Sequence, residues 1–150
     1  RDSPLAATYS YNLVDHEDGV DDNQGGSAAA ITAYAVSSEF DLDDGHKYMF
    51  VSRVIPDISF DGSTADNPVA TLTLSPLANP GAGYTSPTST GGVNNATVTR
   101  TATSPVEVFT EQLDIRVRGR QLSMRIESAA TGVTWQLGTP RLDMRPDGRR

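Results

Sequence analysis

The 150-residue chain contains no cysteine, one lysine, one tryptophan and two histidines. Without cysteine it can form no disulfide, offer no thiolate to a metal and supply no cysteine nucleophile. The absence of cysteine does not indicate whether the chain works in an oxidising or a reducing compartment. No apolar run approaches the roughly 18 residues of a membrane-spanning helix, and residues 1–12 have neither the basic head nor the apolar middle of a secretory signal. We therefore expect no membrane insertion.

The motifs that usually mark catalysis, phosphate binding or metal binding are missing as well. His16 and His46 lie in separate acidic segments and share no metal-ligand spacing. There is no G-x-S-x-G motif, and neither glycine pair, at 25–26 or at 91–92, is followed by the Lys-Ser/Thr of a phosphate-binding loop. The acidic cluster at 15–22 does not have the spacing of a calcium loop. The sequence therefore predicts a protein that is not an enzyme and has no cofactor and no metal ion.

Length and composition are those of one folded domain. With 37% hydrophobic and 21% charged residues, a chain of this size can bury a substantial core and does not resemble a disordered segment. We expect residues 1–150 to form a single domain. Because the chain begins with Arg1, we expect either a processed product or, in preference, the ordered part of a longer polypeptide.

Side-chain polarity alternates at every position through most of residues 112–128 and again through 133–137. A period of two places alternate side chains on opposite faces of a strand, so these segments are predicted strands with one buried face. The first two strands are expected to form an antiparallel hairpin with its turn at 118–120, and a third strand follows a turn at 130–132. Trp135 should contribute most to the core, roughly 3–5 kcal/mol if replaced by alanine. The expected core residues are Leu113, Ile115, Val117, Leu122, Met124, Ile126 and Trp135.

The remaining segments are also short strands separated by turns, and none has the 3.6-residue period of a helix. A second hairpin is expected where residues 39–42 and 48–55 flank the turn-forming residues 43–46. Ser104-Pro105 is expected to end a threonine-rich edge strand at 97–103. Further strands are predicted at 8–14, 29–37, 58–60, 69–74 and 141–145, with long loops at 15–28 and 75–95. The predicted fold class is all-β, an antiparallel β-sandwich or jelly-roll-like domain with long Gly/Pro/Ser/Thr loops.

Charge is distributed unevenly along the chain. Residues 1–75 carry thirteen acids against three basic residues, whereas residues 76–150 carry nine arginines against six acids. Arginine pairs with carboxylates through two parallel hydrogen bonds, so the C-terminal arginines are expected to bind carboxylates across strands or across subunit contacts. The composition of a GC-rich genome would explain the arginines equally well, and a nucleic-acid surface is disfavoured because acids share the same strand faces. The predicted contact residues are Arg116, Arg118, Arg120, Arg125, Arg141 and Arg145.

Three segments of the sequence resemble a known family. They are FDLDDGHKYMFVSRVIPDISFDG at 40–62, TVTRTATSPVEVFTEQLDIRVRGRQLSMRIES at 97–128 and GVTWQLGTPRLDMRPDGRR at 132–150. Together they are similar to the C-terminal part of a large virion structural protein of short-tailed bacteriophages, many of them marine, which we associate with the tail nozzle. The resemblance implies a non-enzymatic subunit of the virion tail, with six copies in a ring. Its partners would be the other tail proteins, and DNA would be passing cargo during ejection.

Two other functions remain open at this stage. A β-sandwich module could present the loop 75–95, with Tyr84, to a glycan or protein of the host surface. A capsid decoration protein would share the fold class and the lack of catalysis but would sit on the capsid shell. For a tail tube, the acidic N-terminal half would suit a channel lining that does not grip phosphates, and the arginine-rich half would suit contacts between subunits.

Overall fold

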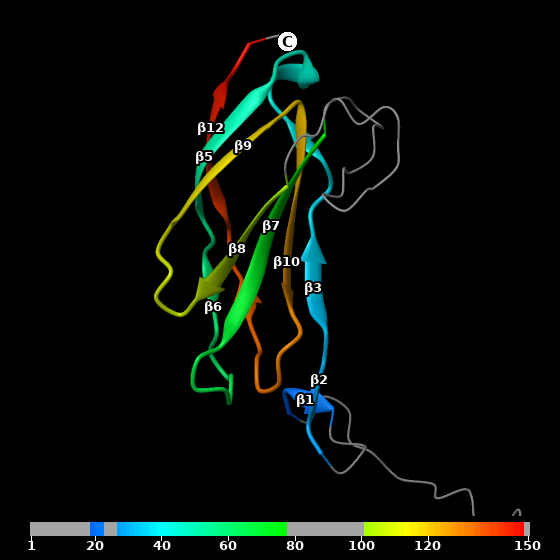
Figure 1. Ribbon diagram of the computed structural model, residues 1–150, viewed down its shortest axis with the longest axis vertical. Coiled ribbons are helices and arrows are strands. Elements are labelled where there is room, and N and C mark those ends of the chain that lie inside the picture. The colour runs from blue at the N-terminus through cyan, green and yellow to red at the C-terminus, as the bar shows by residue number, and fades with distance from the viewer. Residues whose placement is uncertain (1–18, 23–26, 78–100, 149–150) are drawn as a thin grey trace, which may run out of the picture.

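The computed structural model describes residues 19–22, 27–77 and 101–148. Within these ranges the regular elements are antiparallel strands and one turn of 3-10 helix, η1 (Asp43–Gly45). The all-β antiparallel sandwich predicted from the sequence is confirmed, and two main sheets run along the length of the molecule (Figure 1). The strands are β1 (Asp21–Asp22), β2 (Ala29–Ala30), β3 (Ala33–Val36), β4 (Phe40–Asp41), β5 (Met49–Ile55), β6 (Ile58–Ser59), β7 (Val69–Leu77), β8 (Ala102–Glu107), β9 (Leu113–Gly119), β10 (Gln121–Ser128), β11 (Gln136–Leu137) and β12 (Arg141–Pro146).

The first sheet has the strand order β3-β10-β7-β8, and β4 follows β3 along the same edge of β10. Ser37 joins the two short strands to that edge. Its N–H donates to the Met124 carbonyl at 2.8 Å, and its hydroxyl accepts from the Met124 N–H at 2.9 Å. The buried hydroxyl of Ser123 donates to the Ser37 carbonyl at 3.1 Å. The edge of β10 therefore stays hydrogen-bonded where β3 has ended and β4 has not yet begun.

The second sheet has the order β12-β5-β9, and the short pairs β1–β2 and β6–β11 lie outside the two main sheets. In β5, Val51 and Val54 are both fully buried although they are three positions apart. Simple alternation would send them to opposite faces. The register shifts in both ladders at this point: between Val51 and Val54, β5 has one residue more than β12 and one fewer than β9, as at a β-bulge, and both valines face the core.

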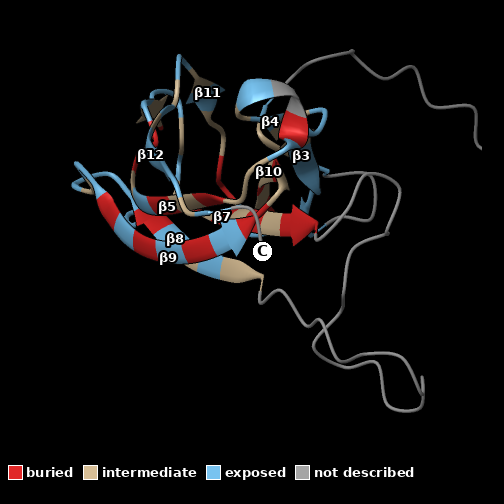
Figure 2. Cartoon of the chain, turned by 90° about the horizontal axis from the view of Figure 1, so that it is seen from above, coloured by how far each residue is buried: buried red, intermediate tan, exposed pale blue. Residues whose placement is uncertain are grey.

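One core lies between the two sheets. The inward side chains come from β5 and β9 on one side and from β7, β8 and β10 on the other, and in Figure 2 the ribbon of β9 is banded by the predicted alternation of buried and exposed residues. Of the predicted core residues, Leu113, Ile115, Val117, Leu122 and Ile126 are buried, while Met124 and Trp135 are partly buried and pack against the core. Trp135 thus lies at the margin of the core, and the largest fully buried side chains include Met49, Leu72 and Leu74.

Both predicted hairpins are wrong. β9 pairs with β5 in the second sheet, and β10 pairs with β7, β3 and β4 in the first, so the chain crosses between sheets at Gly119. Likewise β4 pairs with β10 in the first sheet, whereas β5 pairs with β9 and β12 in the second. The segment that contains η1 therefore also connects the two sheets. A glycine between two amphipathic strands is equally suited to a hairpin turn and to a sheet corner, because both need a sharp change of direction. The partner of each strand is decided by the distant strands.

Several predicted boundaries also change. β7 continues through Pro76 to Leu77, where 75–95 was expected to be loop, and β8 continues through Pro105, which was expected to end a strand. Pro105 is tolerated because β8 is an edge strand, and Pro76 lies beyond the part of β7 that pairs with β8. The expected strand 133–137 is reduced to the two residues of β11, and the expected loop 15–28 contains β1. Four predicted segments lie wholly or partly outside the described residues. They are the strand 8–14, residues 15–18 and 23–26 of the first long loop, residues 78–95 of the second long loop, and residues 97–100 of the threonine-rich strand.

Candidate interaction surfaces

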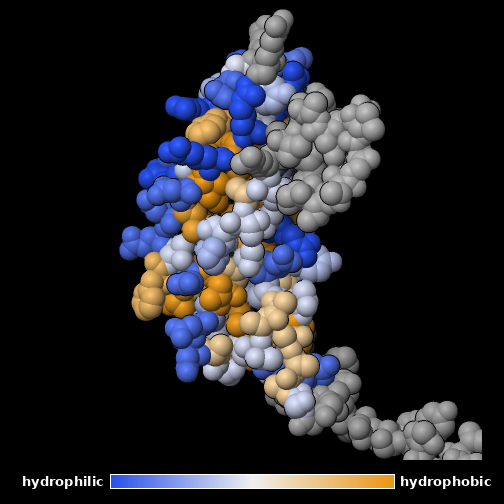
Figure 3. Space-filling model, viewed as in Figure 1, coloured by the Kyte–Doolittle hydropathy of each residue, from blue (hydrophilic) through white to orange (hydrophobic). Residues whose placement is uncertain are grey.

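The six arginines predicted to make contacts lie at three separate places. Arg116 and Arg118 of β9 and Arg141 and Arg145 of β12 lie on the outer face of the second sheet, Arg120 is at the sheet corner, and Arg125 is on the outer face of the first sheet. Hydrophilic side chains gather along the side of the molecule that carries β9, β5 and β12 (Figure 3). The outer surface of the second sheet is called the arginine face below.

Opposite charges alternate across the arginine face. The strand register places Arg53 of β5 between Asp114 of β9 and Asp143 of β12, and Arg53 Nη2 lies 2.6 Å from Asp143 Oδ2. Such cross-strand pairs stabilise a sheet by a few tenths of a kcal/mol to about 1 kcal/mol each. Part of the arginine pattern is therefore explained within a single chain, as the sequence analysis allowed.

Aromatic rings hold two arginine side chains of the face, and one at the sheet corner, in place. The guanidinium carbon of Arg118 is 4.2 Å from the ring centroid of Tyr48, and that of Arg145 is 4.9 Å from the ring of Phe50. Arg120, at the corner, lies 5.1 Å from the same Tyr48 ring. Arg118 Nε also donates to Asp147 Oδ2 at 2.5 Å. Cation–π stacking and ion pairing together order these long side chains, which lowers the entropy cost of using them in a contact.

The arginine face keeps an excess of positive charge. Its five arginines, Arg53, Arg116, Arg118, Arg141 and Arg145, face three aspartates, Asp114, Asp143 and Asp147, which leaves two unmatched positive charges. Among the residues that the structure describes, neither Arg116 nor Arg141 forms an ion pair. Both side chains are exposed, so each can reach a carboxylate or phosphate of another molecule.

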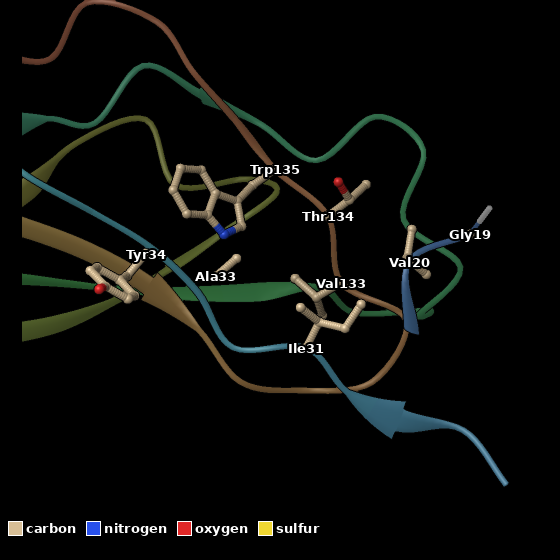
Figure 4. A pocket seen from close by; sticks show the side chains of 8 residues that line it. All are labelled: Gly19, Val20, Ile31, Ala33, Tyr34, Val133, Thr134 and Trp135. Atoms are coloured by element: carbon tan, nitrogen blue, oxygen red, sulfur yellow. The ribbon is translucent and has the colours of Figure 1, made fainter. Parts of the chain in front are cut away.

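A hollow of about 310 Å³ opens beside the β3 edge of the first sheet. Its lining is mainly apolar, and the residues come from the segment just before β1, from β3 and the segment just before it, and from the segment before β11 (Figure 4). Trp135 forms one wall. Its indole Nε1 donates a hydrogen bond to the buried hydroxyl of Ser128 at 3.0 Å, so the one polar atom of the ring already has a partner within the chain. We call this cavity the Trp135 hollow; it is lined by Gly19, Val20, Ile31, Ala33, Tyr34, Val133, Thr134 and Trp135.

Asp21 ties the outer wall of the Trp135 hollow to the turn before β11. Both carboxylate oxygens accept from the buried Gly132 N–H, at 2.7 and 2.9 Å. We expect Asp21→Ala to lower the free energy of unfolding by about 1–2 kcal/mol, because the buried N–H would lose a charged acceptor. Denaturant unfolding should report the loss. Asp21→Asn keeps one acceptor oxygen and should lose less; equal losses in the two variants would show that this hydrogen bond is not the cause.

A second exposed feature, at the turn between β8 and β9, was not predicted from the sequence. The Thr110 N–H donates to the Glu107 carbonyl at 3.0 Å, and the Glu107 N–H donates to the Thr110 hydroxyl at 2.9 Å, so two hydrogen bonds close the turn. At its tip Phe109 is 92% exposed and Val108 is 55% exposed. The available signal was an apolar pair flanked by glutamates, at a position where a turn usually carries polar residues. We call residues 107–110 the Phe109 turn.

Within the described residues there is no cluster of three or more His, Asp or Glu side chains that could hold a metal ion, and no helix with the length and apolarity to cross a membrane. Comparisons with protein-family models, with curated proteins and with solved structures gave no match to this chain. The β-sandwich class and its exposed surfaces are therefore the basis for a functional proposal.

Proposed function

We propose that this chain is a non-enzymatic structural module of a bacteriophage virion, part of the tail nozzle through which DNA is ejected. The proposal combines the resemblance of residues 40–62, 97–128 and 132–150 to a tail protein with one structural observation. That observation is the β3 edge of the first sheet, which carries exposed apolar side chains and no charged residue.

The β3 edge is apolar and uncharged. Ile31, Tyr34 and Val36 are 51%, 61% and 51% exposed, and residues 27–38 contain no charged side chain. Within the described part of the chain, β3 pairs with β10 alone, so no other described strand lies along its second side. Edge strands of monomeric proteins usually carry charges or prolines that prevent pairing with other chains. An edge without these features favours a role in assembly.

The arginine face is consistent with such a role if it is turned away from the channel. Two unmatched positive charges facing passing DNA would bind phosphates and slow ejection, whereas Arg116 and Arg141 facing a neighbour could pair with its carboxylates. We propose that the partners are further copies of this chain in a ring, taken to be a hexamer, and other tail proteins. In this arrangement DNA is cargo and not a ligand.

Peptide mapping of purified particles, with and without detached tails, tests the proposal. We expect peptides of this sequence to map to the C-terminal end of a much longer chain and to be lost together with the tails. Peptides of the major shell protein, measured in the same samples, are the control and should be retained. A separate protein of 16.0 kDa that stays with the shell would overturn the tail assignment and favour capsid decoration.

A further inference from the structure

Two exposed apolar features of this chain are complementary and lie on opposite sides of the molecule. The Phe109 turn projects from the side where β8 leads into β9, and the Trp135 hollow lies on the other side, beside β1 and β3 (Figure 1). One is a protruding aromatic side chain and the other is an apolar cavity with aromatic walls. We propose that Phe109 of one copy inserts into the Trp135 hollow of a second copy, so that the copies associate head to tail.

The Phe109 turn has the properties of an interface anchor. Its two hydrogen bonds, at 3.0 and 2.9 Å, fix the backbone that carries the 92%-exposed ring, so little conformational freedom is left to lose on binding. Aromatic side chains with few rotamers and large apolar area are the residues that dominate binding energy in interfaces. A phenylalanine held out in water by a closed turn is unfavourable in an isolated chain and becomes favourable when it is covered.

The Trp135 hollow matches that anchor in size and chemistry. Its volume of about 310 Å³ is at the lower end of the range for small-ligand pockets and is enough for one aromatic ring. Figure 4 shows Trp135 and Tyr34 on one side of the hollow and the side chains of Val133 and Ile31 lying together farther along it. A phenylalanine ring there could pack edge-to-face against either aromatic wall while contacting the aliphatic side chains.

Acidic residues flank the Phe109 turn, and the margin of the hollow carries one arginine together with acids, among them Glu127 and Asp21. The exposed glutamates Glu107 and Glu111 flank Phe109, and the guanidinium carbon of Arg125 lies 4.5 Å from the Tyr34 ring at the margin of the hollow. Arg125 already pairs with Glu127 at 2.6 Å, but its five N–H donors allow it to donate to a second carboxylate as well. A glutamate that arrives with Phe109 would therefore meet a positively charged group held in position by stacking.

A contact between two different surfaces of the same chain is heterologous, so each copy keeps one free anchor and one free hollow after pairing. Repetition closes a ring or extends a filament, depending on the rotation between copies. This contact presupposes the proposed function as an assembling subunit, and it specifies which two surfaces of the chain meet.

Complementary variants of the 150-residue chain test the contact. Phe109→Asp removes the anchor and leaves the hollow intact, and Ile31→Glu places a charge in the hollow and leaves the anchor intact. Sedimentation velocity over a concentration series should show that each substitution weakens self-association at least tenfold, as expected for the loss of a central aromatic anchor. Met144→Glu, which changes another exposed apolar side chain on the β12 edge, should associate like the wild type. Matching thermal unfolding curves must show that all variants are folded.

Mixing the two variants gives the decisive result. One intact contact remains possible between the hollow of the Phe109→Asp chain and the anchor of the Ile31→Glu chain, so an equimolar mixture should form dimers and no larger species. Trp135, the only tryptophan, should shift its fluorescence to shorter wavelength in these dimers because its exposed edge loses water. The proposal is overturned if the wild type stays monomeric up to about 1 mM. It is also overturned if Phe109→Asp still assembles while Ile31→Glu does not, because the hollow would then hold some other group.

These results are separable from the test of the virion assignment. If peptides of the chain are found in tails but Phe109→Asp assembles normally, the tail assignment stands and this contact is wrong. If the chain is absent from tails but the mixed variants form only dimers, the contact stands and the virion assignment is wrong.

Discussion

Replacing Leu72 by alanine should lower the free energy of unfolding by about 3–5 kcal/mol, the largest effect that we expect from any single truncation. Leu72 is completely buried in β7, which has strand neighbours on both sides, Ile126 of β10 and Ser104 of β8. Because these neighbours are fixed by the ladders, the core can collapse little around the missing atoms, and a cavity adds to the lost transfer free energy. Such a loss is a large fraction of the 5–15 kcal/mol that stabilises a typical domain.

Urea unfolding followed by the fluorescence of Trp135 measures this effect. Thr71→Ala is the matched control, since Thr71 is the preceding residue of the same strand and is not buried in the core. We expect the control to cost less than about 1 kcal/mol, which reflects strand propensity alone. If both variants lose the same free energy, the inward and outward assignment of β7 is wrong.

Gly119→Ala should cost about 2–3 kcal/mol, although it adds a single methyl group. Gly119 is buried at the corner where the chain leaves the second sheet, and a Cβ there would lie 2.8 Å from Cβ of Pro76 and 2.9 Å from the Gln121 carbonyl oxygen. Neither is the end of a flexible side chain, so relief requires the backbone of β7 or β10 to move. Overpacking of this kind typically costs 1–3 kcal/mol.

The same unfolding experiment tests the corner. Ser52→Ala, at an exposed position of the neighbouring strand β5, should leave stability within about 0.5 kcal/mol of the wild type. In an open hairpin turn, replacing glycine by alanine at a compatible backbone angle would instead be neutral or slightly stabilising, because it restricts the unfolded chain. A stabilised Gly119→Ala variant would therefore contradict the close packing described for the corner.

Local pattern predicted the faces of the strands but not their partners. In β9 the alternation of Leu113, Ile115 and Val117 with charged residues correctly gave the buried face, because burial depends on one strand's own period. Pairing depends on which strands meet across the core, and the sequence around Gly119 contains no information about β5 or β7. The prolines show the same limit: Pro105 has a strong local preference to end a strand, and its edge position removes the cost of keeping it.

The interaction surfaces were predictable to a similar degree. The outward direction of Arg116 and Arg118 follows from the alternation of β9, whereas the stacking of Arg118 on Tyr48 needs β5 and β9 to be neighbours. The Trp135 hollow joins residues that are about one hundred positions apart, Ile31 and Trp135, so no local motif describes it. Phe109 did have a local signal, its place in a turn.

The topology also has a consequence for the order of events during synthesis. β12 pairs with β5, and this ladder joins residues more than eighty positions apart, such as Arg141 and Ile55. The second sheet therefore cannot be completed until residue 146 has left the ribosome, and until then β5 presents an unpaired edge with the apolar residues Met49, Val51 and Val54. Chains dominated by such distant pairings fold in milliseconds to seconds, not microseconds. During that interval the nascent chain is the form most exposed to aggregation, so a chaperone that shields β5 would matter more for yield than for the stability of the finished domain.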